Sequence, residues 1–174
     1  ALLIYYMTKH LLLSQGQASQ IYGLYTGFVY LTPFFGGILA DRVWGQRKTV
    51  IVGGVLMAIG HFLMAFEGAF LFALLALIVG VGLFKGNIAS QVGELYGPND
   101  LRRAMAFQIF CIAINVSVIV APLISGTLGE KVGWHWGFGT AGVVMVAGLI
   151  LYIYAKPWLP AESRELRAEK ARKP

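Results

Sequence analysis

The segment from Phe70 to Leu95 constrains this chain most, because it is apolar for its first fifteen residues and then carries Lys85. It is long enough to cross a bilayer as a helix. A lone ammonium group in such a helix costs about 2.5–3.5 kcal/mol on insertion scales. Snorkelling to an interface is one reading of Lys85, but the nearer end, at Glu94, lies about 13 Å away along a helix. We therefore predict that Lys85 has a functional role, beside a partner or in a water-filled cavity.

The composition extends this constraint to the whole chain. Of its 174 residues, 57% are hydrophobic and 13% are charged, whereas soluble domains carry about 25% charged residues. The net charge of +6 comes from basic clusters in alternate loops, as the positive-inside rule expects. The charge therefore indicates topology, with both ends of the chain on the cytoplasmic side, and it argues against a nucleic-acid partner.

The hydropathy pattern predicts an all-α membrane protein with six transmembrane helices. The expected spans are residues 1–13, 20–40, 49–66, 69–95, 103–128 and 137–155. Thirteen residues reach only about 20 Å, so we expect the first helix to be truncated and the chain to be part of a longer protein. Residues 14–19 are expected to form a short turn. Residues 1–156 then form one transmembrane bundle, and residues 157–174 form a charged cytoplasmic linker, for which binding to anionic lipid is an alternative.

Three polar side chains on different predicted helices share one depth in the membrane. Tyr30, Lys85 and Asn115 lie about 16, 14 and 18 Å from the inner boundaries of their helices at 1.5 Å per residue, and half of the hydrocarbon core is about 15 Å thick. Transporters place their substrate sites near this depth. An ammonium group suits an anionic ligand, and the carboxamide and phenol add hydrogen-bonding groups.

Each member of this trio also has a structural reading. Tyr30 is compatible with simple packing, and Asn115 with a hydrogen bond that joins two helices. Apart from Glu94 at the end of its span, no Asp or Glu lies in the predicted membrane segments to balance Lys85. The sequence contains no HExxH, CxxC, GxSxG or P-loop pattern, so we expect neither enzymatic activity nor a metal or organic cofactor.

The segment from Gly36 to Gly60, GGILADRVWGQRKTVIVGGVLMAIG, resembles the loop between helices 2 and 3 of the major facilitator superfamily. Its GGILAD, VWG and TV elements are similar to the proton-dependent oligopeptide transporter family in particular. Two further segments resemble that family, GVGLFKGNIAS at residues 80–90 in its helix 4 and AFQIFCIAINVSVIVAPLISG at residues 106–126 in its helix 5. The residues that match the family's inner-loop gating motif are Gly37, Asp41, Arg42, Gly45, Arg47 and Lys48.

The resemblance implies the N-terminal six-helix half of a bacterial proton-coupled symporter in the cell inner membrane. Such a protein carries di- and tripeptides by alternating access against a C-terminal bundle, with protons as the coupling ion and lipid around it. The resemblance gives Lys85 a role in binding the peptide carboxylate and in proton coupling, and it places Tyr30 and Asn115 against the peptide backbone. The chain departs from the family pattern at Gly86, Cys111 and Ser117, and the paired-glutamate motif of helix 1 is absent.

Two other functions remain open at this point. One is another facilitator-type carrier, for nitrate, a sugar or a drug. The other is a membrane sensor or assembly subunit that uses the same bundle without transporting anything. The residues on either side of this chain in the natural gene would separate these possibilities.

Overall fold

The computed structural model describes residues 2–159, and this part of the chain is helical, without a strand. The six α-helices are α1 (Leu2–Lys9), α2 (Gln15–Leu39), α3 (Gln46–Leu63), α4 (Phe70–Glu94), α5 (Leu101–Lys131) and α6 (Trp134–Ala155). Three short turns, Ala40–Trp44, Glu67–Ala69 and Lys156–Trp158, complete the helical elements. Following the predicted topology, we call the end with the turn at residues 64–69 the outer end and the end with the loop at residues 40–45 the inner end.

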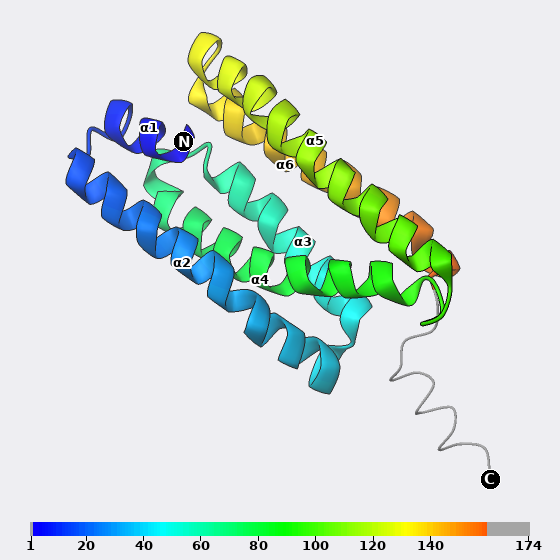
Figure 1. The fold of residues 1–174 in the computed structure, drawn as a ribbon. Helices are drawn as coiled ribbons and strands as arrows, with labels where there is room; N and C mark the ends of the chain where they lie inside the picture. The colour runs from blue at the N-terminus through cyan, green and yellow to red at the C-terminus, as the bar shows by residue number, and fades with distance from the viewer. Residues whose placement is uncertain (1, 160–174) are drawn as a thin grey trace.

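The five long helices pack side by side in the order α2, α4, α3, α6 and α5 (Figure 1). The α5–α6 pair forms one flank and α2 forms the other, while the short helix α1 lies at the outer end. In this arrangement α5 packs mainly on α6, and most of its side chains are exposed.

Glycines allow the central helices to approach one another closely. A Cβ atom on Gly36 of α2 would lie 2.1 Å from the carbonyl oxygen of Gly82 on α4, and one on Gly53 of α3 would lie 2.8 Å from that of Gly80. Small residues play this part in membrane helix pairs because association there depends on van der Waals packing and hydrogen bonds. The two contacts join α2, α4 and α3 through nearly touching backbones.

An aromatic cluster closes the bundle at its outer end. Tyr6 of α1 is 1% exposed and packs against Phe70, Trp134 and Phe138 with ring centroids 5.1–5.9 Å apart. The Nε2 atom of His10 lies 2.7 Å from a carboxylate oxygen of Glu67. These contacts attach the short α1 to α4 and α6, although α1 has only eight residues.

Helices α2, α3, α5 and α6 begin two to five residues earlier than predicted, and at α2 and α5 a polar side chain caps the backbone. The residues expected as a turn at 14–19 are helical from Gln15, since Ser14 and Gln17 form a reciprocal capping box. Helix α5 begins at Leu101, two residues earlier than predicted, with the Asp100 side chain accepting a hydrogen bond from the Arg102 amide at 2.9 Å. Such caps satisfy backbone N–H groups that have no partner within the helix.

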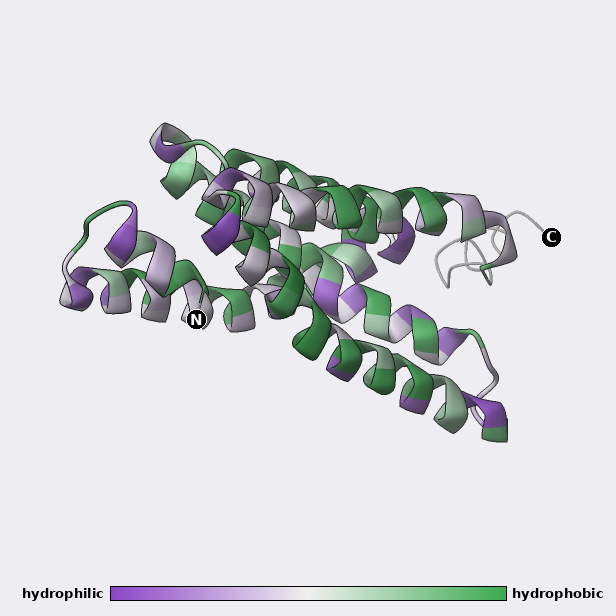
Figure 2. Ribbon diagram, turned by 90° about the horizontal axis from the view of Figure 1, so that it is seen from above, coloured by the Kyte–Doolittle hydropathy of each residue, from purple (hydrophilic) through white to green (hydrophobic). Residues whose placement is uncertain are grey.

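Four segments are long and apolar enough to span a membrane: Gln15–Trp44, Glu67–Glu94, Leu101–Lys131 and Trp134–Trp158. Apolar residues cover most of the length of these helices, and hydrophilic residues gather mainly toward helix ends (Figure 2). The all-α membrane class is therefore confirmed. The spanning roles of α1 and α3 stay predictions, and the linker predicted for residues 157–174 lies almost wholly outside the described residues.

Candidate functional site

The structure brings together two members of the predicted trio, Lys85 on α4 and Tyr30 on α2. The Nζ atom of Lys85 lies over the phenol ring, 4.6 Å from its centroid. An ammonium group at this distance from an aromatic face is attracted by the negative potential of the ring. The contact arises because α2 and α4 are packed neighbours and both residues lie in the middle of their helices.

The pair is open to the outside of this bundle. Tyr30 is 72% exposed, and Lys85 is exposed as well. Among residues 2–159, no carboxylate forms a salt bridge with Lys85. Within the described residues, the Lys85 ammonium thus contacts the Tyr30 ring but no carboxylate. This exposed positive charge is suited to receive an anionic group.

Asn115, the third member, is an exposed residue of α5. Its Nδ2 atom donates to the carbonyl oxygen of Cys111 in the same helix at 2.8 Å. The alternative role considered for Asn115, a hydrogen bond that joins two helices, is not the one that this bond fills. Its carboxamide oxygen can accept from another molecule, and the second hydrogen on Nδ2 can still be donated.

Two polar residues that the sequence did not single out connect α2 to α4 beside the Tyr30–Lys85 pair. The Asn87 side chain is buried, and its Nδ2 atom donates to Gly36 O at 3.2 Å and to Leu83 O at 2.8 Å. The Thr32 hydroxyl lies 2.9 Å from Phe28 O and 3.0 Å from Ile78 O. The signal in the sequence was an amide two residues after Lys85, within the same apolar segment.

A cavity of about 580 Å³ is lined by residues of α3, α4, α5 and α6. Its lining is mainly apolar, and its polar members are His61, Ser117, Ser125, Thr140 and Tyr152. The hydroxyls of Ser117 and Thr140 are already hydrogen-bonded to carbonyls of their own helices. None of the predicted trio lines this cavity, so it is distinct from the exposed Lys85 face.

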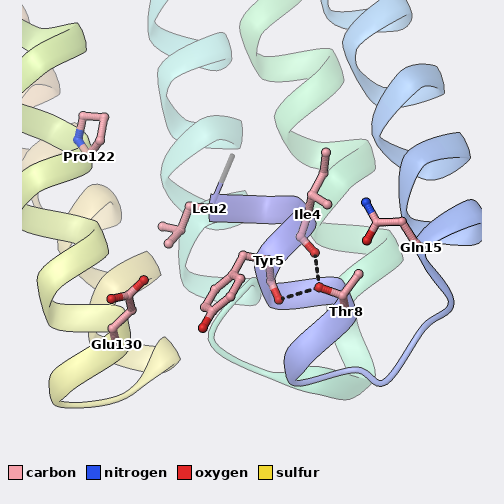
Figure 3. Close-up of a pocket in the computed structure, with 7 residues that line it drawn as sticks. All are labelled: Leu2, Ile4, Tyr5, Thr8, Gln15, Pro122 and Glu130. Carbon is pink, nitrogen blue, oxygen red and sulfur yellow. Dashed lines mark hydrogen bonds between the residues drawn. The ribbon is translucent and has the colours of Figure 1, made fainter.

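A second cavity, also of about 580 Å³, lies at the outer end between α1, the start of α2, and α5 (Figure 3). The Tyr5 ring of α1 and the Glu130 carboxylate of α5 face each other across it, with Pro122 farther along α5. The Thr8 hydroxyl is hydrogen-bonded to the α1 backbone at Ile4 and Tyr5. This cavity is a gap between α1 and α5 and contains no lysine or arginine in its lining.

The predicted inner-loop motif occupies the turn from α2 into α3. Gly45 has φ +83°, a backbone conformation that favours glycine, and its carbonyl accepts the Thr49 hydroxyl at 2.7 Å. Arg47 Nη2 donates to the carbonyl of Leu159 at 3.0 Å, which joins the start of α3 to the segment that follows α6. Gly36 packs closely on α4, whereas a Cβ on Gly37 would meet no atom within 4 Å.

Charges at the inner end are concentrated around this loop and the start of α5. Asp41, Arg42 and Lys48 of the motif are exposed. At the α5 start, the Asp100 carboxylate accepts hydrogen bonds from the Arg102 guanidinium at 2.8–3.1 Å. The hydrogen bonds from Arg102 hold the pKa of Asp100 below its usual range. Within the described residues, no group of three or more His, Cys, Asp or Glu side chains is placed to hold a metal ion.

Comparison with known proteins agrees with this arrangement. Residues 47–167 match the family model described as the POT family. The chain belongs to the POT family. It is 43% identical over 145 residues to the peptide transporter YePEPT of Yersinia enterocolitica, covering 80% of this chain and 28% of that protein. It is 39% identical over 166 residues to a di-/tripeptide transporter of Lactococcus lactis, covering 90% of this chain and 33% of the relative.

Solved structures lead to the same family. A crystal structure of peptide transporter POT in complex with sulfate matches with a TM-score of 0.86 at 34% identity, covering 98% of this chain and 38% of that one. A POT family transporter in complex with 5-aminolevulinic acid matches with a TM-score of 0.83 at 30% identity, covering 88% and 33% of the two chains. The chain thus spans about a third of the length of the relatives it matches.

Proposed function

We propose that this chain supplies the N-terminal half of the central site of a proton-coupled symporter for di- and tripeptides. The observation that carries this proposal is the exposed Lys85 ammonium held over Tyr30 near the middle of α4. Family membership supports the substrate class, since relatives of this chain are named as peptide and di-/tripeptide transporters. A peptide carboxylate is the anionic group that Lys85 would receive.

Each site residue then has a separate task. Lys85 pairs with the C-terminal carboxylate and takes part in proton coupling. Tyr30 offers its hydroxyl and ring face, and Asn115 offers its carboxamide oxygen, to the peptide backbone. A C-terminal bundle closes the site from the other side, and the loop from Gly37 to Lys48 contributes to closure at the inner end.

The proposal places the complete protein in the cell inner membrane, with both ends of this segment on the cytoplasmic side. Protons are the coupling ion, and no organic cofactor takes part. Transport requires two alternating openings around one site, so this segment alone would not carry peptide across a membrane.

The test is uptake of labelled di-alanine by proteoliposomes that contain the complete natural protein, with an inward proton gradient imposed. We expect uptake that an excess of unlabelled dipeptide abolishes and that nitrate, sugars and cationic drugs leave unchanged. Lys85→Ala should abolish the gradient-driven component, whereas Lys9→Ala, which removes an exposed lysine at the outer end, should not. Gradient-driven uptake that resists unlabelled dipeptide, or that survives Lys85→Ala, would contradict the proposal.

A further inference from the structure

Two hydrogen bonds join α2 to α4 through residues that are close in sequence to Tyr30 and Lys85. On α2, Thr32 follows Tyr30 by two residues and reaches the backbone of α4 at Ile78 O, 3.0 Å away. On α4, Asn87 follows Lys85 by two residues and reaches the backbone of α2 at Gly36 O, 3.2 Å away. Each helix therefore holds the backbone of the other through a side chain next to a site residue.

The reach of both bonds depends on how closely the two backbones approach. A Cβ on Gly82 would lie 2.5 Å from Thr32 Cβ, and one on Gly36 would lie 2.1 Å from Gly82 O. The two glycines therefore leave room for the Thr32 side chain and for direct contact between the two backbones. Thr32 and Asn87 then set the register of α2 against α4, because each donor meets one particular carbonyl of the neighbouring helix.

Asn87 is 3% exposed, and a buried amide without partners would be costly. Its two donor contacts, to Gly36 O and to Leu83 O of its own helix, satisfy the NH₂ group. A hydrophobic residue would fill this position without such a requirement. The amide is explained by the connection it makes between the helices.

We propose that Asn87 and Thr32 are positioning residues that hold the Lys85 ammonium over Tyr30 and thereby increase its affinity for a peptide carboxylate. The proposal rests on the proposed function, because it assigns to these two residues the geometry of the same site. Neither residue needs to touch the peptide. Their effect passes through the register of α2 and α4, and hence through the 4.6 Å contact between Lys85 and the ring of Tyr30.

The experiment measures equilibrium binding of di-alanine and of its C-terminal amide to the complete natural protein in detergent. The ratio of the two affinities reports the contact between Lys85 and the carboxylate, and a change that only loosens the fold would weaken both ligands together. We expect Asn87→Ala and Thr32→Val to lower the ratio about threefold, with the affinity for the amide unchanged, as for the loss of one hydrogen bond in a membrane protein. Thr32→Ser, which keeps the hydroxyl, should retain the wild-type ratio.

Ser90→Ala is the matched control. Within the described residues, the Ser90 hydroxyl of α4 is hydrogen-bonded to Gly86 O of its own helix and to no other group. The ratio of the two affinities in this variant should equal that of the wild type. Thr32→Val is nearly isosteric and decides the matter if Asn87→Ala fails to fold. An unchanged ratio in folded Thr32→Val would overturn the proposal. If the wild type shows no preference for the carboxylate, the proposed role of Lys85 fails; if Lys85→Ala alone loses that preference, only the role of Asn87 and Thr32 fails.

Discussion

At the residue scale, the central feature is a lysine that meets an aromatic ring where a carboxylate would be the usual partner. A cation over an exposed aromatic face gains about 0.5–1 kcal/mol, which is less than the cost of burying an ammonium group. The Lys85–Tyr30 pair therefore leaves most of the binding capacity of the charge available to a ligand. Its exposure on the α2–α4 face is consistent with that use.

The two functions of Tyr30 can be separated by substitution. Tyr30→Phe keeps the ring under Lys85 and removes the hydroxyl, whereas Tyr30→Leu removes both. We expect Tyr30→Leu to weaken dipeptide binding about two- to fivefold more than Tyr30→Phe, which corresponds to the loss of an exposed cation–π contact. Titration calorimetry with di-alanine on the complete protein measures this difference. Equal affinities for the two variants would show that the ring face contributes nothing.

Membrane depth predicted which residues meet, but only in part. Counting residues from the inner boundary gave Tyr30 and Lys85 similar heights, and in the structure the Lys85 ammonium lies over the Tyr30 ring. Asn115 has a similar predicted height, yet its amide is bonded to Cys111 of its own helix. Residue counts along a helix give height and not the direction of a side chain around the axis. For the same reason the sequence could not predict which backbone carbonyls Asn87 and Thr32 reach on the neighbouring helix.

At the scale of the elements, α2 and α4 pack through a glycine seam, formed by Gly36 of α2 and Gly82 of α4, where the two backbones touch. Gly36→Ala would force the new methyl group against the Gly82 backbone. We expect a loss of about 1–3 kcal/mol in stability, as for overpacking of a tight interior. Thermal unfolding of the purified protein in detergent measures it.

Gly16→Ala provides the control for this seam, because Gly16 is in the same helix and a Cβ there would meet nothing within 4 Å. Alanine is the better helix former, so Gly16→Ala should unfold at or slightly above the wild-type temperature. Similar unfolding temperatures for the two variants would contradict the close approach of α2 and α4.

The start of α5 depends on the charge of Asp100. Arg102 lowers the pKa of this carboxyl in the folded state, so the stabilisation by the cap is complete above the ordinary pKa of 3.8 and is lost as pH falls through the lower folded-state pKa. Asp100→Asn keeps a capping oxygen but does not titrate. The difference in unfolding temperature between wild type and Asp100→Asn should therefore be constant at neutral pH and shrink below pH 3.8. A difference that grows on acidification would contradict the sign of this shift.

Helix ends were the elements that the sequence predicted least well. Ser14, Gln15 and Gln17 are polar and uncharged, which is compatible with a turn, but the reciprocal bonds of Ser14 and Gln17 start α2 there. The middles of the long helices were predictable because hydropathy alone determines them. A cap depends on two or three individual hydrogen bonds. Hydropathy averaged over many residues therefore does not show at which residue a helix begins.

At the scale of the whole molecule, the packing order α2, α4, α3, α6 and α5 leaves α2 and α5 on the two flanks. These two helices expose large apolar side chains such as Phe34, Phe35 and Ile119. Together with the match to about a third of longer transporters, this arrangement agrees with a bundle that forms one part of a larger membrane protein. The family resemblance predicted this organisation; hydropathy gave only the number and length of apolar segments.

The proposed topology can be measured by labelling in intact cells. In a cysteine-free background that includes Cys111→Ser, an impermeant maleimide should label Gly68→Cys at the outer turn. Asn99→Cys, at an exposed position of the inner turn, should be labelled only after the cells are made permeable. Labelling of Asn99→Cys in intact cells would place that turn outside the cell and would contradict the proposed topology.

The most direct test of the account is the affinity of the complete protein for di-alanine with and without the Lys85 charge. A hydrogen bond to a charged group contributes about 1.5–3 kcal/mol. Lys85→Ala should therefore weaken di-alanine binding by about 10- to 150-fold, while the affinity for di-alanine amide stays at its wild-type value. Wild-type affinity for di-alanine in folded Lys85→Ala, measured by calorimetry, would contradict the claim that Lys85 receives the peptide carboxylate.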